Sequence, residues 1–161
     1  MPNWVRNHIE FGTDKVLKEC ITKTERDMDE FDFNKVIPMP KELEEENGLE
    51  KLTIEERLLF LKEHNGCDNW YDWCIQNWGT KWNSNETFII NDKVVEFDTA
   101  WSMPEPVLRE ISRKYNTTVR VEFADEGIIE NSGTVIYEDG MEVFYEPGDD
   151  RFRKKVWGWD V

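Results

Sequence analysis

The order of hydrophobic periodicities along the chain most constrains its fold. Residues 3–11 alternate apolar and polar side chains, which predicts a strand. Residues 13–24 place their apolar side chains on one stripe of a helix. A second strand is predicted over residues 31–37, because the prolines at positions 38 and 40 would end it there. The chain is therefore predicted to begin with strand, helix and strand.

The same order returns in the second half. A strand is predicted over residues 87–97, with a bulge or tight turn at residues 91–92. Ser102 and Glu105 match a capping box, which predicts the start of a helix before the alternating strand of residues 117–123. The two halves combine into βαββαβ, the ferredoxin-like split βαβ arrangement of an α+β protein.

The remaining segments divide the single domain that is predicted for residues 1–161. Residues 38–86 predict a helical, Trp-rich insertion between strands. Residues 131–147 predict an acidic C-terminal hairpin, since Asp139-Gly140 is a strong two-residue turn signal. Residues 151–161 form a basic-aromatic tail, which we expect to fold back on the acidic hairpin. The alternative is that the tail contacts nucleic acid or a partner.

Two short helices are predicted inside the insertion. Thr53 and Glu56 match a capping box for the first helix, and Asp68 is the predicted N-cap of the second. The second helix would carry four side chains on one face: Trp70, Trp73, Cys74 and Asn77.

The net charge of −15 favours basic partners and disfavours direct contact with phosphate. No basic stripe is present, so we expect no binding to duplex DNA. No apolar run approaches the roughly 20 residues of a membrane-spanning helix. The N-terminus lacks the pattern of a signal peptide, which makes the cytoplasm the expected location.

An acidic run near the C-terminus is the preferred candidate for a working surface. From Val121 to Asp150 there are ten acidic residues and no Lys or Arg. Such a run could mimic DNA for a basic nucleic-acid-binding channel, because duplex DNA carries one charge per about 1.7 Å of axis. The predicted partner-binding residues are Asp125, Glu126, Glu130, Tyr137, Glu138, Asp139, Glu142, Phe144 and Glu146.

The predicted hairpin register divides these acids between two faces. A turn at residues 139–140 pairs Tyr137 with Glu142, and Val135 with Phe144. Aromatic side chains then accompany the acids, which is typical of a protein-binding edge. The alternative is a solvated edge whose charges only block aggregation.

The tryptophans indicate a second candidate site. Five of the eight tryptophans fall between residues 70 and 101. Aromatic walls with a few polar groups are typical of ligand pockets, so a pocket for a nucleotide or other small ligand could be lined by Trp78, Lys81, Trp82 and Trp101. The alternative is that these side chains pin the insertion onto the sheet.

Nothing in the sequence specifies catalysis. No nucleophile, phosphate-loop or metal motif has its required spacing, and neither His8 nor His64 has an identifiable partner. The three cysteines lack CxxC spacing and are expected to be buried thiols. We therefore expect no metal and no cofactor, and the sequence favours a binding protein over an enzyme.

Several short motifs resemble one family. These are Met1-Pro2-Asn3-Trp4 with Asn7, the run from Asn77 to Asn83, and the run from Thr99 to Ser102 followed by Pro104. They are similar to the YubB-type ferredoxin-like domains of phages, plasmids and prophages, although Val5 stands where many relatives have Cys.

The resemblance implies the fold and a mobile-element origin, and it brings no reaction or catalytic residues. Combined with the acidic run, it favours an inhibitor of a host defence complex, of the anti-CRISPR or antirestriction type. Such a protein would act in the cytoplasm of the host cell.

Overall fold

A six-stranded antiparallel sheet organises the molecule, which the computed structural model describes over residues 1–160. The strand order is β4-β5-β1-β6-β7-β8. The strands are β1 (Trp4–Phe11), β4 (Asn85–Asn91), β5 (Val94–Ala100), β6 (Val119–Asp125), β7 (Ser132–Glu138) and β8 (Met141–Pro147). The βαββαβ core consists of β1, helix α1 (Lys15–Cys20), β4, β5, helix α5 (Glu105–Lys114) and β6, in this order along the chain. The predicted ferredoxin-like fold is confirmed, and β7 and β8 extend its sheet.

The second core strand lies later in the sequence than predicted. It is β4, which follows the helical segment and forms a hairpin with β5, so residues 87–97 are not one strand. Near residues 31–37 the chain forms only β3 (Asp29–Phe31), paired with β2 (Ile21–Lys23), and then the 3-10 turn η1 (Phe33–Lys35). Phe31 and Phe33 are both fully buried, and this mimicked strand alternation. Asp32 breaks the strand because its carboxylate accepts a hydrogen bond from Asn34 N.

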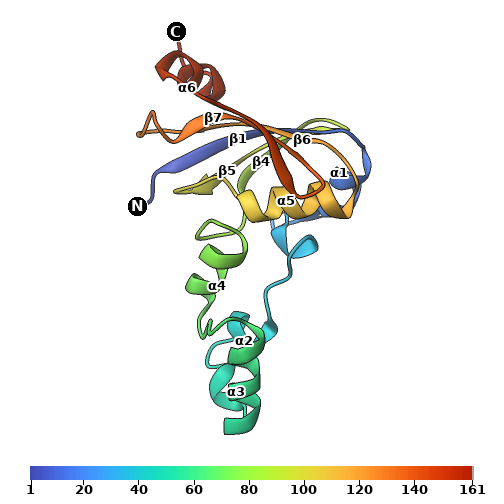
Figure 1. The fold of residues 1–161 in the computed structure, drawn as a ribbon, viewed down its shortest axis with the longest axis vertical. Helices are drawn as coiled ribbons and strands as arrows, with labels where there is room; N and C mark the ends of the chain where they lie inside the picture. The colour runs from blue at the N-terminus through green and yellow to red at the C-terminus, as the bar shows by residue number, and fades with distance from the viewer. Residues whose placement is uncertain (161) are drawn as a thin grey trace.

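The two faces of the sheet are covered differently. Helices α1 and α5 pack on one face, and α6 (Asp150–Trp157) lies on the other (Figure 1). The α5 side encloses the core, where Ile9 and Phe97 of the sheet and Ile111 of α5 are fully buried. Burying aliphatic and aromatic side chains of this size stabilises the fold by about 1.5–3 kcal/mol each.

The helical segment between η1 and β4 projects away from the sheet (Figure 1). It contains α2 (Lys41–Glu44), η2 (Leu49–Lys51), α3 (Ile54–Glu63) and α4 (Trp70–Asn77). The predicted capping box of Thr53 and Glu56 is confirmed at the start of α3. The N-cap of α4 is Asn69 instead of Asp68, because the Asn69 side chain accepts a hydrogen bond from Asp72 N.

Trp78 attaches the end of this segment to η1 and the residues that follow it. Its Nε1 donates a 2.9 Å hydrogen bond to Ile37 O, and its ring packs edge-on against Phe33 and Trp73. On α4 only Trp73 and Cys74 are buried, whereas Trp70 is exposed. The predicted four-residue face is therefore wrong, because α4 rests against the rest of the chain along a narrower stripe.

The basic-aromatic tail forms α6, and its described part ends at residue 160. Trp157 Nε1 donates a 2.9 Å hydrogen bond to Ala124 O of β6, and the Arg6 guanidinium of β1 lies 4.5 Å above the Trp157 ring. Lys155 pairs with Glu122 at 3.4 Å. The tail therefore packs on β6 and β1, and not mainly on the hairpin as predicted. The Glu122 carboxylate of β6 attracts Lys155 of the tail, whereas the acids of β8 lie two strands away at the edge of the sheet.

Candidate functional site

The acidic hairpin forms from β7 and β8, with its turn at Asp139-Gly140. Tyr137 pairs with Glu142 as predicted, but Val135 pairs with Tyr145 instead of Phe144. The register shifts by one residue beside Tyr137, as in a β-bulge. The predicted pairing of Val135 with Phe144 is therefore wrong, because a bulge inserts one residue into the strand and sequence alternation does not reveal it.

Tyr137 is not on the surface. It is fully buried, and the Arg109 guanidinium of α5 lies 5.0 Å from its ring centroid. Arg109 also donates a 3.1 Å hydrogen bond to Gly140 O, which ties the hairpin turn to α5. Burial raises the pKa of the Tyr137 phenol. Tyr137 therefore anchors the hairpin, and the prediction that it contacts a partner does not fit its position.

Asp125 is also buried, and it builds the loop that leads into β7. Its carboxylate accepts hydrogen bonds from Gly127 N at 2.7 Å, Ile128 N at 2.9 Å and Asn131 Nδ2 at 3.0 Å. The neighbouring Glu126 is half-buried and accepts a hydrogen bond from Trp4 N at 2.9 Å. Both acids therefore serve the fold. The predicted residues that face solvent are Glu130, Glu138, Asp139, Glu142, Phe144 and Glu146.

Strand β8 forms an exposed edge of the sheet, and all seven of its residues face solvent. Sequence reasoning missed Val143 and Tyr145, which are 52% and 50% exposed, while Phe144 is 43% exposed. Hydrophobic side chains in a hairpin strand normally indicate a buried face, but in the part of the chain that the structure describes both faces of this edge strand are exposed. We call residues 141–147 the β8 edge. It combines apolar side chains with the carboxylates of Glu142 and Glu146.

The residues predicted to line a tryptophan pocket divide into one buried side chain and a partly exposed cluster around Lys81. Trp78 is buried and structural, whereas Trp82 and Trp101 are 38% and 41% exposed. The Lys81 ammonium lies 4.4 Å from the Trp82 ring centroid, 5.1 Å from Trp101 and 6.0 Å from Tyr71 of α4. We call Tyr71, Lys81, Trp82 and Trp101 the Lys81 cluster. Its cation–π contacts contribute about 0.5–2 kcal/mol each.

Trp101 has an unusual backbone. Its φ is +70°, and Ser102 N donates a 2.9 Å hydrogen bond to Ala100 O, so residues 100–102 form a γ-turn with positive φ at the centre. This is the rarer and more strained form of γ-turn. For a bulky side chain such a conformation costs about 1–3 kcal/mol, and surrounding contacts must enforce it.

Hydrogen bonds on all sides hold this turn. Trp101 N donates to Asn3 O at 2.9 Å, and Trp101 O accepts from Asn131 Nδ2 at 2.9 Å. Ser102 Oγ donates a 2.5 Å hydrogen bond to Gly79 O. Ser102 therefore does not form the predicted capping box of α5, whose N-cap is Pro104.

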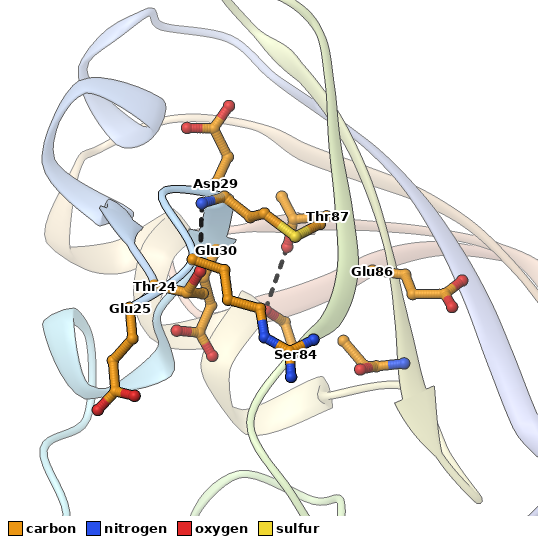
Figure 2. Close-up of a pocket in the computed structure, with 10 residues that line it drawn as sticks. Thr24, Glu25, Asp29, Glu30, Ser84, Glu86 and Thr87 are labelled. Atoms are coloured by element: carbon orange, nitrogen blue, oxygen red, sulfur yellow. Dashed lines mark hydrogen bonds between the residues drawn. The ribbon is translucent and has the colours of Figure 1, made fainter.

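One cavity lies beside β4, between this strand and the β2–β3 hairpin. It measures about 410 Å³, and Figure 2 shows the hydroxyls of Ser84 and Thr87 inside it, with Glu25 and Glu86 pointing away in opposite directions. Ser84 Oγ donates to Phe31 O, and Phe31 N donates to Thr87 Oγ1. These side chains bridge β3 to β4 where no backbone pairing joins them. Burial raises the pKa of Glu30, which also lines the cavity.

A second cavity of about 340 Å³ lies between α6 and the sheet. His8 faces it together with Glu96, and their side chains approach to 3.8 Å, so His8 has a partner that the sequence did not reveal. The cross-strand register places His8 opposite both Glu96 and Glu122. The described lining of this cavity combines Arg6 and Lys155 with Glu96 and Glu122, and it includes no Ser, Thr or Cys.

Other chemistry is sparse in the described part of the chain. Within residues 1–160, no three His, Cys, Asp or Glu side chains gather as a metal site would require. Cys20, Cys67 and Cys74 are free and buried, and burial raises the pKa of Cys74 to about 12. No helix within these residues has the length and apolar character needed to cross a membrane.

Comparison with known proteins places the chain in a family. No curated protein matches it. The crystal structure of the protein api92 from Yersinia pseudotuberculosis is similar, with 18% identity and a TM-score of 0.43. That similarity covers 51% of this chain and 31% of the other. A family model described as "Ferredoxin-like domain in Api92-like protein" matches residues 77–159, from the end of α4 through α6. The chain therefore belongs to the family of ferredoxin-like domains in Api92-like proteins.

Proposed function

We propose that this chain is a non-catalytic binding protein whose β8 edge contacts a basic protein surface. The observation that carries the proposal is the exposure of all seven β8 residues at the edge of the sheet. An exposed edge strand can add a strand from a partner, whose side chains then meet those of the edge. Phe144 and Tyr145 offer aromatic anchors, which are the residue types that dominate binding energies.

Charge supports a basic heterologous partner for the β8 edge. Glu142 and Glu146 lie near its two ends, and Glu138 and Asp139 precede it at the exposed turn. Antiparallel pairing of two copies would bring Glu142 of one copy near Glu146 of the other, and like charges opposite each other are destabilising. A strand or channel that carries Lys and Arg would meet these carboxylates favourably and be steered toward them.

The biological role that we propose is inhibition of a host defence complex of the anti-CRISPR or antirestriction type. The YubB-type motifs support an origin in a phage or other mobile element, acting in the cytoplasm of the host cell. The partner would be a nucleic-acid-binding channel, and the exposed carboxylates would replace part of the DNA charge. Because Asp125 is buried and Glu126 is half-buried, such mimicry rests on fewer acids than the sequence offers.

Reversal of four acids tests the proposal. Glu138, Asp139, Glu142 and Glu146 are changed together to Lys, and the variant is compared with wild type in capture of partners from a host lysate. We expect the wild-type partner to be lost from the variant and to be displaced from wild type by a duplex DNA oligonucleotide. Circular dichroism should show an unchanged fold, because all four side chains are exposed. Capture that survives the reversal would refute the proposal.

A further inference from the structure

We propose that the Lys81 cluster is a binding site for a nucleoside monophosphate, with the base stacked on Trp101 and the phosphate on Lys81. This site is separate from the β8 edge, and its function does not depend on the function proposed for that edge. It draws together three parts of the chain: Tyr71 from α4, Lys81 and Trp82 from the connection to β4, and Trp101 from the turn after β5.

Backbone strain at Trp101 is the first observation. Surrounding hydrogen bonds force a bulky residue into positive φ, and yet its ring stays 41% exposed and is not buried in the core. Packing alone does not explain this arrangement, since glycine would accept the same backbone without cost. Strain that a structure maintains is typical of ligand clamps, where it holds a group ready for its ligand.

The charge at Lys81 is the second observation. Within residues 1–160 its ammonium forms no ion pair, and it lies within 6.0 Å of the ring centroids of Tyr71, Trp82 and Trp101. Ring faces hold the cation in place but do not neutralise it. The cluster therefore offers a positioned positive charge beside two partly exposed indole rings, which matches a ligand with an anionic group and a flat aromatic part.

The overall charge of the molecule limits the size of that ligand. A net charge of −15 repels a long polyanion, whereas a mononucleotide carries few charges. Stacking of one base on an aromatic side chain contributes about 1–3 kcal/mol in single-strand binders. With a charge-assisted contact to Lys81, we expect a dissociation constant of about 0.1–1 mM.

Titration of the full chain with AMP tests the site, with tryptophan fluorescence and calorimetry as readouts. Adenosine and inorganic phosphate each supply half of the ligand, and we expect both to bind about tenfold more weakly than AMP. Lys81→Gln should weaken AMP binding by about tenfold, while the matched control Lys62→Gln on the exposed side of α3 should not change it.

Trp101→Gly separates a binding role from a structural one. If the Trp101 ring serves binding, this variant loses AMP affinity while its Tm stays close to that of wild type, because relief of the positive φ offsets the lost cation–π contact with Lys81. If Trp101 serves mainly packing, the Tm falls well below that of wild type. A large fall in Tm, an absence of saturable AMP binding at about 5 mM, or equal binding by Lys81→Gln would each overturn the proposal. Trp82→Phe provides a second variant that keeps an aromatic ring, and it should retain part of the affinity.

Discussion

The two edges of the sheet are both exposed and both apolar in part, but they differ in regularity and charge. On β4, Phe88 and Ile90 are 57% and 52% exposed, yet the strand has two register irregularities, and Thr87 is bridged to β3. On β8, every residue is exposed, and carboxylates flank the apolar side chains. Exposure alone therefore does not make a docking strand. Two register irregularities and the bridge at Thr87 protect β4 from pairing, whereas β8 has one irregularity and carries carboxylates near both ends.

The largest expected effect on stability concerns Tyr137, the buried side chain of β7, the strand next to β8. Tyr137→Ala removes a fully buried ring and should lower the free energy of unfolding by about 3 kcal/mol. Tyr145→Ala, on the exposed edge, should lower it by less than about 1 kcal/mol. Urea denaturation measures both. Equal losses would contradict the division of this hairpin into a buried anchor and a free edge.

Asp125→Ala probes the loop that delivers the chain to β7 and then to β8. The substitution leaves the amide groups of Gly127 and Ile128 without their acceptor, which should cost about 2 kcal/mol of stability. The control is Glu130→Ala in the same loop, which should stay within about 0.5 kcal/mol of wild type. If both variants unfold at the same urea concentration, Asp125 does not hold the loop.

Thr87→Val tests why β4 is the protected edge. It removes the hydroxyl that accepts from Phe31 N and should cost about 1 kcal/mol. Hydrogen exchange at the Phe31 amide should become faster, and the exposed β4 edge should raise the tendency to aggregate. Glu86→Gln, beside it, changes no such bridge and serves as the control. Unchanged exchange at Phe31 would show that the hydroxyl does not close this edge.

A smaller effect is expected on the face between the two edges. Burial raises the pKa of Glu122, but the hydrogen bond from Arg120 and the charge of Lys155 outweigh it, so the net shift is downward. A lowered pKa contributes stability above the unfolded value of about 4.3, and this contribution is lost as pH falls through the folded value. The indole N–H signal of Trp157 in NMR should therefore move in acid as α6 loosens. Lys155→Gln should move that transition to higher pH, and an identical profile would contradict the coupling.

The sequence predicted the order of core elements because alternation and helical stripes report burial directly. It misplaced the second strand because Phe31 and Phe33 are both buried in a segment that turns at Asp32. Periodicity shows that one face of a strand or helix is apolar. It does not show that another element covers that face. The exposure of Val143 follows only from the position of β8 in the sheet.

The candidate sites were predictable only in part. Acid content marked the hairpin, but the burial of Tyr137 depends on Arg109 of α5, which is distant in the sequence. Lys81 and Trp82 are adjacent in the sequence, so their proximity was predictable. The γ-turn at Trp101 was not, because a bulky residue disfavours positive φ and tertiary hydrogen bonds create the turn.

The most direct test compares Phe144→Lys on β8 with Phe88→Lys on β4, the same substitution at exposed phenylalanines of the two edges. Phe88 lies opposite Glu96, so the new lysine is accommodated there. Partner capture from a host lysate is measured at low and then high salt. We predict that Phe88→Lys captures the partner like wild type, that Phe144→Lys loses it, and that high salt releases it from wild type. Capture by Phe144→Lys that equals wild type would contradict binding through the β8 edge.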